Sequence, residues 1–193
     1  TDRPVVRIAR VHDAIGPVSA RFMTDAIERA EAEKAECVLF ELDTPGGLDD
    51  SMRLVIKSML GAQVPVVVYV APAGARAASA GTFITLAAHV AAMAPNTVIG
   101  AAHPVSVGGE AMETNMSAKV ANDAAALIRS LAEKRGRNVE WADSAVRQSV
   151  SLSETEALAK KVVDLVAPSL DALLKELDGR VVKVNDEPRT IRT

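Results

Sequence analysis

Short apolar runs alternate along the chain with segments whose apolar residues recur every three or four positions. Three continuous apolar runs, 37–42, 66–70 and 90–93, have the length of strands that are buried on both faces of a parallel sheet. Between such runs lie helical stripes, as in the segment that carries Met23 and Ile27. This alternation predicts an α/β domain with a mainly parallel sheet.

The remaining elements follow from weaker patterns. Further strands are expected at 5–11, 97–99, 162–166 and 181–184, and helices at 17–34, 49–60, 79–89, 116–135, 139–150, 153–160 and 170–177. Asp49 or Asp50 is a candidate helix cap, and Ser153 with Glu156 forms a capping box. Gly74 to Ala78 predicts a small-residue turn, and 106–115 predicts an exposed loop.

Charged residues are almost absent from the middle of the chain. Between Lys57 and Glu110 the only Asp, Glu, Lys or Arg is Arg76. A gap of this length resembles a membrane span, but the prolines and glycines within it would leave backbone groups unsatisfied in lipid. We therefore interpret this stretch as the interior of the domain and as the region of the functional site.

Composition excludes several classes of protein. The chain has 22 Lys and Arg against 25 Asp and Glu, and 3% aromatic residues, so we expect no nucleic-acid partner. The single cysteine, Cys37, lies in an apolar run and is expected to be a core thiol, without a disulfide or a thiolate zinc site. Three scattered histidines without matching carboxylate spacing argue against a catalytic metal site.

Candidate chemistry gathers at the carboxyl ends of two predicted strands, where ligands bind in parallel sheets. Ser79 follows small residues at the start of a predicted helix, where the N–H of Ala80 lacks a partner within the helix. Gly46 and Gly47 in the other loop can supply a second N–H at close approach. These residues suggest a nucleophile beside an oxyanion hole. The alternative is that Ser79 only caps a helix and the glycines only form a turn.

A serine nucleophile needs a base, and two residues compete for this role. Lys119 is the only Lys or Arg between Arg76 and Arg129, and it lies among small apolar residues. Burial would favour its neutral amine, which could accept the hydroxyl proton. His103 needs no such tuning near neutral pH. The alternatives are a solvated lysine and a structural histidine; His12 and His89 are expected to be structural.

Several motifs in one order resemble the NfeD family of membrane-bound serine proteases, Clp-like peptidases associated with stomatin or flotillin relatives. The resemblance covers about residues 5–179 and rests on Asp43-Thr44-Pro45-Gly46-Gly47, Pro65-Val66-Val67-Val68-Tyr69-Val70, Ala77-Ala78-Ser79-Ala80-Gly81-Thr82, Met93-Ala94-Pro95-Asn96-Thr97-Val98-Ile99-Gly100-Ala101 and Gly136-Arg137-Asn138. It implies a Clp/crotonase-like fold of stacked ββα units.

The resemblance also implies roles for individual residues. Ser79 falls on the family's nucleophile, Lys119 on its general base, and Gly47 and Ala80 on the amides of its oxyanion hole. No cofactor is implied. Gly46 and Arg76 are expected to bind substrate, although Arg76 could instead pair with an acid, and His103 stays the alternative base.

For the whole protein, the resemblance implies a serine endopeptidase that cleaves an apolar segment of a stomatin-like membrane partner. Residues 1–180 would form the protease domain, and 181–193 a C-terminal strand and tail leading to a membrane region. The domain would be soluble, extracytoplasmic (periplasmic or extracellular) and a homodimer or higher homo-oligomer. Two alternatives stay open. One is a crotonase-type acyl-CoA enzyme, disfavoured because no carboxylate lies between Asp50 and Glu110. The other is a catalytically silent module that binds a membrane partner.

Overall fold

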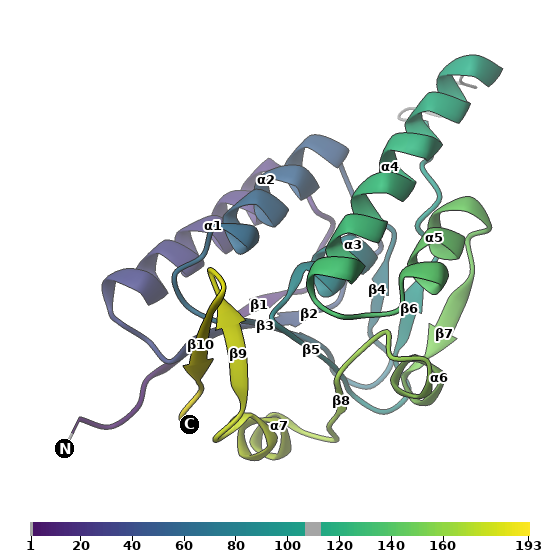
Figure 1. The fold of residues 1–193 in the computed structure, drawn as a ribbon. Coiled ribbons are helices and arrows are strands. Elements are labelled where there is room, and N and C mark those ends of the chain that lie inside the picture. The colour runs from purple at the N-terminus through teal and green to yellow at the C-terminus, as the bar shows by residue number, and fades with distance from the viewer. Residues whose placement is uncertain (1, 107–112) are drawn as a thin grey trace.

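The computed structural model describes residues 2–106 and 113–193 (Figure 1). Its central sheet has five parallel strands in the spatial order β1-β2-β3-β5-β8. These strands are β1 (Val6–Val11), β2 (Cys37–Leu42), β3 (Val66–Val70), β5 (Val90–Met93) and β8 (Leu165–Val166). The predicted α/β class and its mainly parallel sheet are therefore confirmed.

Helices and loops cover both faces of this sheet, which explains why its inner strands are continuously apolar. Every residue of β3 is buried. On one face, Phe40 and Val68 pack with residues of α1 (Pro17–Ala32), α2 (Asp49–Leu60) and α3 (Ala80–Ala87). On the other face, Leu39 and Val67 pack with the apolar side of α7 (Leu170–Leu177).

A second, three-stranded sheet carries the turn that leads into α3. It consists of β4 (Arg76–Ala78), parallel to β6 (Val98–Gly100), which in turn is antiparallel to β7 (Ser151–Ser153). The chain thus repeats a unit in which one strand enters the main sheet, the next enters the small sheet and a helix follows: β3-β4-α3, then β5-β6-α4, where α4 is Thr114–Lys134. This arrangement is the expected stack of ββα units.

The structure differs from three expectations in this region. The segment Gly74 to Ala78 was predicted as a turn, but its last three residues form β4 because they pair with β6. Strand β7 was not predicted at all. The helix expected over 139–150 is shorter, since α5 (Val139–Arg147) ends before Ser149, which has a positive φ of 54°.

Two capping predictions have different outcomes. The capping box of Ser153 and Glu156 at the start of α6 (Glu154–Ala159) is confirmed. Asp49 and Asp50 do not cap α2, whose N-cap is Leu48; both lie in the first helical turn, where a negative charge is stabilised by the helix dipole. The loop expected over 106–115 falls mainly on residues 107–112, which lie outside the described residues.

The C-terminal segment forms a hairpin of β9 (Val181–Val184) and β10 (Glu187–Thr190). This hairpin and its exit pack against the body of the domain. Ile191 is fully buried, and the guanidinium of Arg192 binds the carboxylate of Glu36, with Nε 3.1 Å from Oε1. The domain boundary at residue 180 stays a prediction.

Two arginines close the C-terminal end of α3, where the last carbonyls of a helix lack partners. Arg137 donates from Nη1 to the carbonyls of Leu86 and Ala88, both at 2.8 Å, and Arg135 donates from Nε to Ala87 at 3.0 Å. The Nη2 of Arg137 also donates to Asp164 at 2.6 Å. Arg137 is only 6% exposed, so this network is part of the core.

We expect Arg137→Met to destabilise the domain by about 3 kcal/mol, because it leaves buried carbonyls and a carboxylate without their donor. The matched control is Arg129→Met, since Arg129 also binds an aspartate, Asp143, at 2.5 Å, but with side chains that are 39% and 29% exposed. That control should cost at most about 1 kcal/mol. Denaturant unfolding measures both values, and equal losses would contradict the structural role of Arg137.

His89 closes the start of β3 by two reciprocal bonds. The backbone N–H of His89 donates to the carbonyl of Val66, and the ring Nδ1 of His89 accepts from the backbone N–H of Val66, both at 2.9 Å. Burial lowers the pKa of His89 to about 3, and Arg135, Arg137 and Lys134 add to this effect. The ring is therefore neutral in the folded protein, as a structural histidine would be.

This neutral ring makes the domain sensitive to acid. The unfolded chain protonates His89 below about pH 6.5, while the folded protein does so only near pH 3. The free energy of unfolding therefore decreases as the pH is lowered through this window. His89→Asn keeps an acceptor for Val66 but does not titrate. Between pH 6 and 5 the wild type should therefore lose up to about 1.4 kcal/mol more free energy of unfolding than this variant. Parallel pH profiles of the two proteins would refute the assignment.

Candidate active site

Ser79 occupies a strained turn between β4 and α3. Its backbone has φ 56° and ψ −118°, a conformation that a residue with a side chain rarely adopts. A serine on a sharp strand-to-helix turn is the arrangement by which hydrolases expose a nucleophile. Ser79 makes no side-chain capping bond to α3, so the interpretation of Ser79 as a simple helix cap is wrong.

Backbone and side-chain bonds hold this turn in place. Ser79 N donates to the carbonyl of Gly100 at 3.0 Å, and the carbonyl of Ser79 accepts from Thr82 N at 2.9 Å. The buried hydroxyl of Thr82 lies 2.9 Å from the same Gly100 oxygen and 3.0 Å from that of Ala77. The strain at Ser79 is therefore maintained by its surroundings rather than relaxed.

The first glycine loop, residues 43–47, is held beside Ser79 by hydrogen bonds to β4. Thr44 pairs with β4, donating from its N–H to Arg76 at 2.8 Å and accepting from Ala78 at 3.1 Å. Gly46, with φ +112°, then lies against the serine, because a Cβ built on it would come within 2.6 Å of the Ser79 Cβ. Only glycine fits this position without displacing the serine.

Two backbone amides next to Ser79 are free of partners among the described residues. Gly47 lies opposite Ile15 in an isolated parallel bridge, and the hydrogen bonds of this bridge are made by the two neighbours of Gly47. Ile15 N donates to the carbonyl of Gly46, and Leu48 N donates to the carbonyl of Ile15, both at 2.8 Å. The N–H of Gly47 itself makes no bond within the described chain. The N–H of Ala80, the first residue of α3, is also free there. A pair of such donors can hold a negatively charged oxygen.

These groups open onto one cavity of about 340 Å³. Its wall combines the loop before α2, α2 itself, the start of α3, the segment after β6 and the N-terminal half of α4. The lining residues are Gly47, Leu48, Asp49, Met52, Arg53, Ser79, Ala80, Phe83, Ala102, Pro104, Val105, Lys119, Val120, Asp123 and Ala124. Most of these side chains are apolar, as expected of a cavity that binds apolar ligands.

The charged residues of this cavity join two helices. Arg53 of α2 binds Asp49 through Nε at 2.8 Å and Asp123 of α4 through Nη2 at 2.5 Å. Both carboxylates of the lining are therefore paired with the same guanidinium. Lys119 of α4 makes no ion pair with any described residue.

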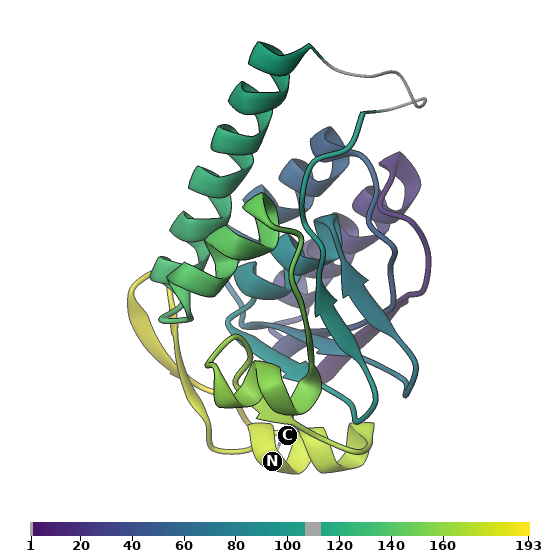
Figure 2. The ribbon, with the colours of Figure 1, turned by 90° about the vertical axis from the view of Figure 1, so that its right-hand side faces the viewer.

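Lys119 lines the cavity that holds Ser79, but it is not buried. Its side chain is exposed, and the expectation of burial in the free chain is wrong. Figures 1 and 2 show the reason, since the first turns of α4 extend beyond the body of the domain. Its small apolar neighbours in sequence lie along a projecting helix and do not enclose it.

The other candidates lie outside this cavity, as far as its described lining shows. His103 places Nδ1 2.7 Å from the carbonyl of Val146, so Nδ1 carries the proton and donates there. Arg76 is exposed, and its N–H binds Asp43 at 3.1 Å. Gly46 is behind Ser79, and its N–H and carbonyl are used by Thr44 and Ile15. The structure thus unites Ser79, Lys119, Gly47 and Ala80.

Cys37 belongs to the core, as the sequence predicts. Burial, with a contribution from Glu36, raises the pKa of the Cys37 thiol to about 12, which confirms a core thiol. No three His, Cys, Asp or Glu residues of the described chain gather into a group that could hold a metal ion. Within residues 2–106 and 113–193, no helix combines the length and the apolar character needed to cross a bilayer.

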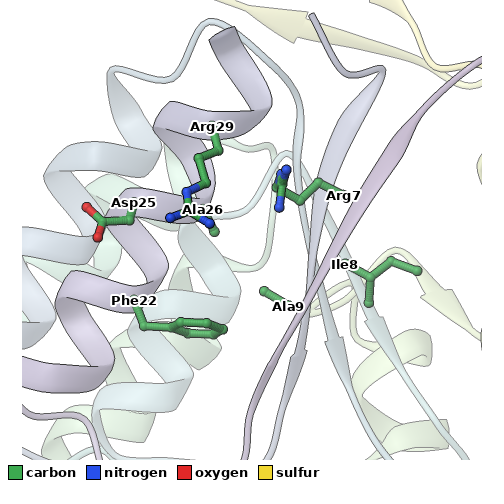
Figure 3. Close-up of a pocket in the computed structure, with 7 residues that line it drawn as sticks. All are labelled: Arg7, Ile8, Ala9, Phe22, Asp25, Ala26 and Arg29. Carbon is green, nitrogen blue, oxygen red and sulfur yellow. The ribbon is translucent and has the colours of Figure 1, made fainter. Parts of the chain in front are cut away.

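A smaller cavity of about 160 Å³ lies between β1 and α1 (Figure 3). Phe22 of α1 points toward Ala9 of the strand, and Arg29 and Arg7 face each other above them. Arg7 is engaged with Glu33. None of the candidate catalytic residues lines this cavity, which therefore offers no alternative site for them.

Sequence reasoning missed the residues that support the serine. Thr82 and Gly100 fix the turn, and Arg53 joins the helices around the cavity. Thr82 and Gly100 do belong to the quoted motifs, but the hydrogen bond that unites them is between residues 18 positions apart. Arg53 carries no local signal, because an exposed helix often has an arginine four residues after an aspartate.

Stacked ββα units around a parallel sheet are typical of the Clp-like class of folds. The model of the family described as "NfeD1b, N-terminal domain" matches residues 5–184. The chain therefore belongs to this family, in agreement with the resemblance in its motifs.

Similar proteins include the membrane-bound protease PH1510 of Pyrococcus horikoshii, which is 38% identical over 183 residues. The match covers 93% of this chain and 41% of PH1510. The membrane protein NfeD1b of Bacillus subtilis is 30% identical over 112 residues, or 58% of this chain and 25% of that protein. This chain thus spans less than half of either relative.

Two solved structures are closely similar to this chain. A serine-to-alanine mutant of 1510-N, a membrane-bound stomatin-specific protease, superimposes with a TM-score of 0.92 at 36% identity, covering 100% of this chain and 94% of that one. A lysine-to-alanine mutant of 1510-N in complex with a substrate peptide gives the same TM-score and identity, covering 100% and 89%. The chain is thus a homologue of a stomatin-specific protease.

The contact between Gly46 and Ser79 can be measured as a coupling energy. Gly46→Ala should destabilise the domain by about 1–3 kcal/mol more than Gly74→Ala, because Gly74 also has a positive φ but no atom within 4 Å of a built Cβ. In a Ser79→Gly background the extra cost should largely disappear, since the clashing Cβ is gone. Thermal unfolding of the four variants tests this, and an unchanged cost in that background would contradict the contact.

Proposed function

We propose that the domain is a serine endopeptidase with Ser79 as nucleophile and Lys119 as general base. The observation that carries this proposal is the union of Ser79, Lys119, Gly47 and Ala80 on one apolar cavity. The two 1510-N mutants replace a serine and a lysine, the same residue types as this pair.

The exposure of Lys119 determines how it would act as a base. Only a neutral amine can accept a proton, so a lysine base has to lose its charge before the attack. An apolar peptide segment that fills the cavity would exclude water from the ammonium group, and desolvation favours the neutral amine. No described carboxylate pairs with Lys119 to oppose this change, because Asp123 and Asp49 are held by Arg53. In this proposal substrate binding completes the catalytic pair.

The proposed reaction proceeds through an acyl-enzyme. Neutral Lys119 takes the hydroxyl proton as the Ser79 oxygen attacks the scissile carbonyl. The N–H groups of Gly47 and Ala80 stabilise the resulting oxyanion, and loss of one such donor typically costs about 100-fold in rate. Lys119 then gives its proton to the leaving amine and activates the water that releases the acyl group. This chemistry needs no cofactor.

We infer an apolar peptide substrate from the cavity itself. Phe83 and Met52 form buried parts of its wall, and the exposed side chains of Leu48 and Val105 extend the apolar surface outward. The family relationship makes a stomatin-like membrane protein the proposed partner. Crotonase-type acyl-CoA chemistry is less well supported, because the carboxylates of the cavity are paired with Arg53.

For the whole protein we propose a membrane-associated homo-oligomer whose protease domain, residues 1–180, lies on the extracytoplasmic side. Residues 181–193 would connect it to a membrane region. The support is the relationship to PH1510, a protein named as membrane-bound, of which this chain matches 41%.

Labelling with a fluorophosphonate probe, with cleavage of an apolar peptide as a second readout, tests the proposal. Both should fall at least about 100-fold in Ser79→Ala and in Lys119→Ala, because the first removes the nucleophile and the second the base. Lys57→Ala removes an exposed lysine of α2 outside the cavity and should change neither readout by more than about twofold.

His103→Ala distinguishes the two possible bases. It should leave labelling within about threefold of the wild type, because the His103 ring binds Val146 and does not line the cavity. Retained labelling in Lys119→Ala together with lost labelling in His103→Ala would assign the base to the histidine. A well-folded wild type that neither reacts with the probe nor cleaves peptide would instead support a silent binding module.

A further inference from the structure

A third cavity, with a polar lining and a volume of about 360 Å³, lies at the opposite end of α4 from Lys119. It forms where the C-terminal end of α4 meets the start of β5 and the C-terminal hairpin, which lie side by side in Figures 1 and 2. The lining residues are His89, Lys134, Arg135, Gly136, Asp164, Arg180, Val181, Val182 and Lys183. None of them lines the cavity of Ser79.

Positive charge dominates this cavity. Lys134, Arg135, Arg180 and Lys183 face a single lining carboxylate, that of Asp164. This carboxylate is already engaged, since its Oδ2 accepts from Arg137 at 2.6 Å and from the N–H of Ala91 at 2.8 Å. Asp164 therefore offsets the buried Arg137, and none of the other four cations forms an ion pair with a described residue.

His89 adds a neutral hydrogen-bond donor. Its Nδ1 accepts from Val66, so the proton of the neutral ring is on Nε2. No described residue accepts a hydrogen bond from this Nε2–H, although the ring lines the cavity and is half-buried. A ligand that fits here must offer acceptors, and a positively charged ligand would be repelled.

One nitrogen of the Arg135 guanidinium lacks a hydrogen-bond partner among the described residues. Its Nε donates to Ala87 at 3.0 Å, but its Nη2 is buried and has no partner among the described residues. Burial, and then the neighbouring Arg137, lower the pKa of Arg135 to about 10, which shows that its charge is held at a cost. A bound anion would stabilise this pair of like charges.

We propose that this cavity is a binding site for a phosphate-type oxyanion, either free phosphate or the phosphate of an anionic lipid headgroup. A tetrahedral oxyanion offers several acceptors at once, which matches the guanidinium groups of Arg135 and Arg180, the ammonium groups of Lys134 and Lys183, and the Nε2–H of His89. The proposal is independent of the chemistry at Ser79.

Calorimetric titration with inorganic phosphate, against sodium chloride at equal ionic strength, tests for the free anion. The variant Arg180→Gln with Lys183→Gln removes two lining charges from positions whose side chains make no bond in the described structure. It should bind phosphate at least about tenfold more weakly than the wild type. The control, Lys57→Gln with Lys175→Gln, removes two exposed charges elsewhere and should change the affinity by less than about twofold.

Sedimentation with vesicles of phosphatidylglycerol, and of phosphatidylcholine as the uncharged reference, tests for the headgroup. Binding to phosphatidylglycerol alone that is lost only in the cavity variant identifies the lipid source, even when free phosphate does not bind. Binding of free phosphate that is lost only in that variant identifies the soluble source. Absence of both, or equal losses in the charge-matched control, overturns the proposal. Circular dichroism confirms that each variant is folded.

Discussion

The carbonyl oxygen of Gly100 supports the functional geometry of this domain. It accepts from the N–H of Ser79 at 3.0 Å and from the hydroxyl of Thr82 at 2.9 Å, and so ties the end of β6 to the turn that leads into α3. This anchor helps to offset the unfavourable backbone conformation at Ser79, together with the bond from Thr82 N to the Ser79 carbonyl. Gly100 itself can have no side chain, because a Cβ there would come within 2.2 Å of the Val150 oxygen. The serine therefore depends on close approach of three chain segments.

The same close approach aligns the free amides with the serine. The first glycine loop is bound to β4 through Thr44, and it places the N–H of Gly47 on the cavity that Ser79 and Ala80 also line. Thr44 and the carbonyl of Gly46 are used in hydrogen bonds that hold the loop, whereas the N–H of Gly47, a residue that lines the cavity, makes no bond within the described chain. In this sense the rigidity of the two loops and the chemistry of the site have one cause.

Helix α4 gives the molecule two electrostatically different ends. Near its start, Lys119 is the unpaired cation on a mainly apolar wall, as far as the described residues show. Near its end, Lys134 and Arg135 join two further cations from the hairpin segment around a polar cavity. At the first end a single exposed charge lies beside an apolar surface, and a ligand that fills the cavity would be needed to desolvate it. At the second end burial, and after it the neighbouring Arg137, disfavour the charge of Arg135, so a negatively charged ligand would be favoured.

The sequence alone determined the α/β class, the buried parallel strands and the position of Ser79 at the turn into a helix, because these depend on local apolar runs and on short motifs. The order of the motifs also identified the family. Three-residue strands such as β4 and β7 could not be predicted, since they exist only through pairing with β6. The same limit applies to Lys119, whose sequence neighbours suggested burial while its helix projects into solvent. Tertiary structure decided which residues surround Ser79 and how far Lys119 is exposed to solvent, because both depend on segments that are distant in the chain.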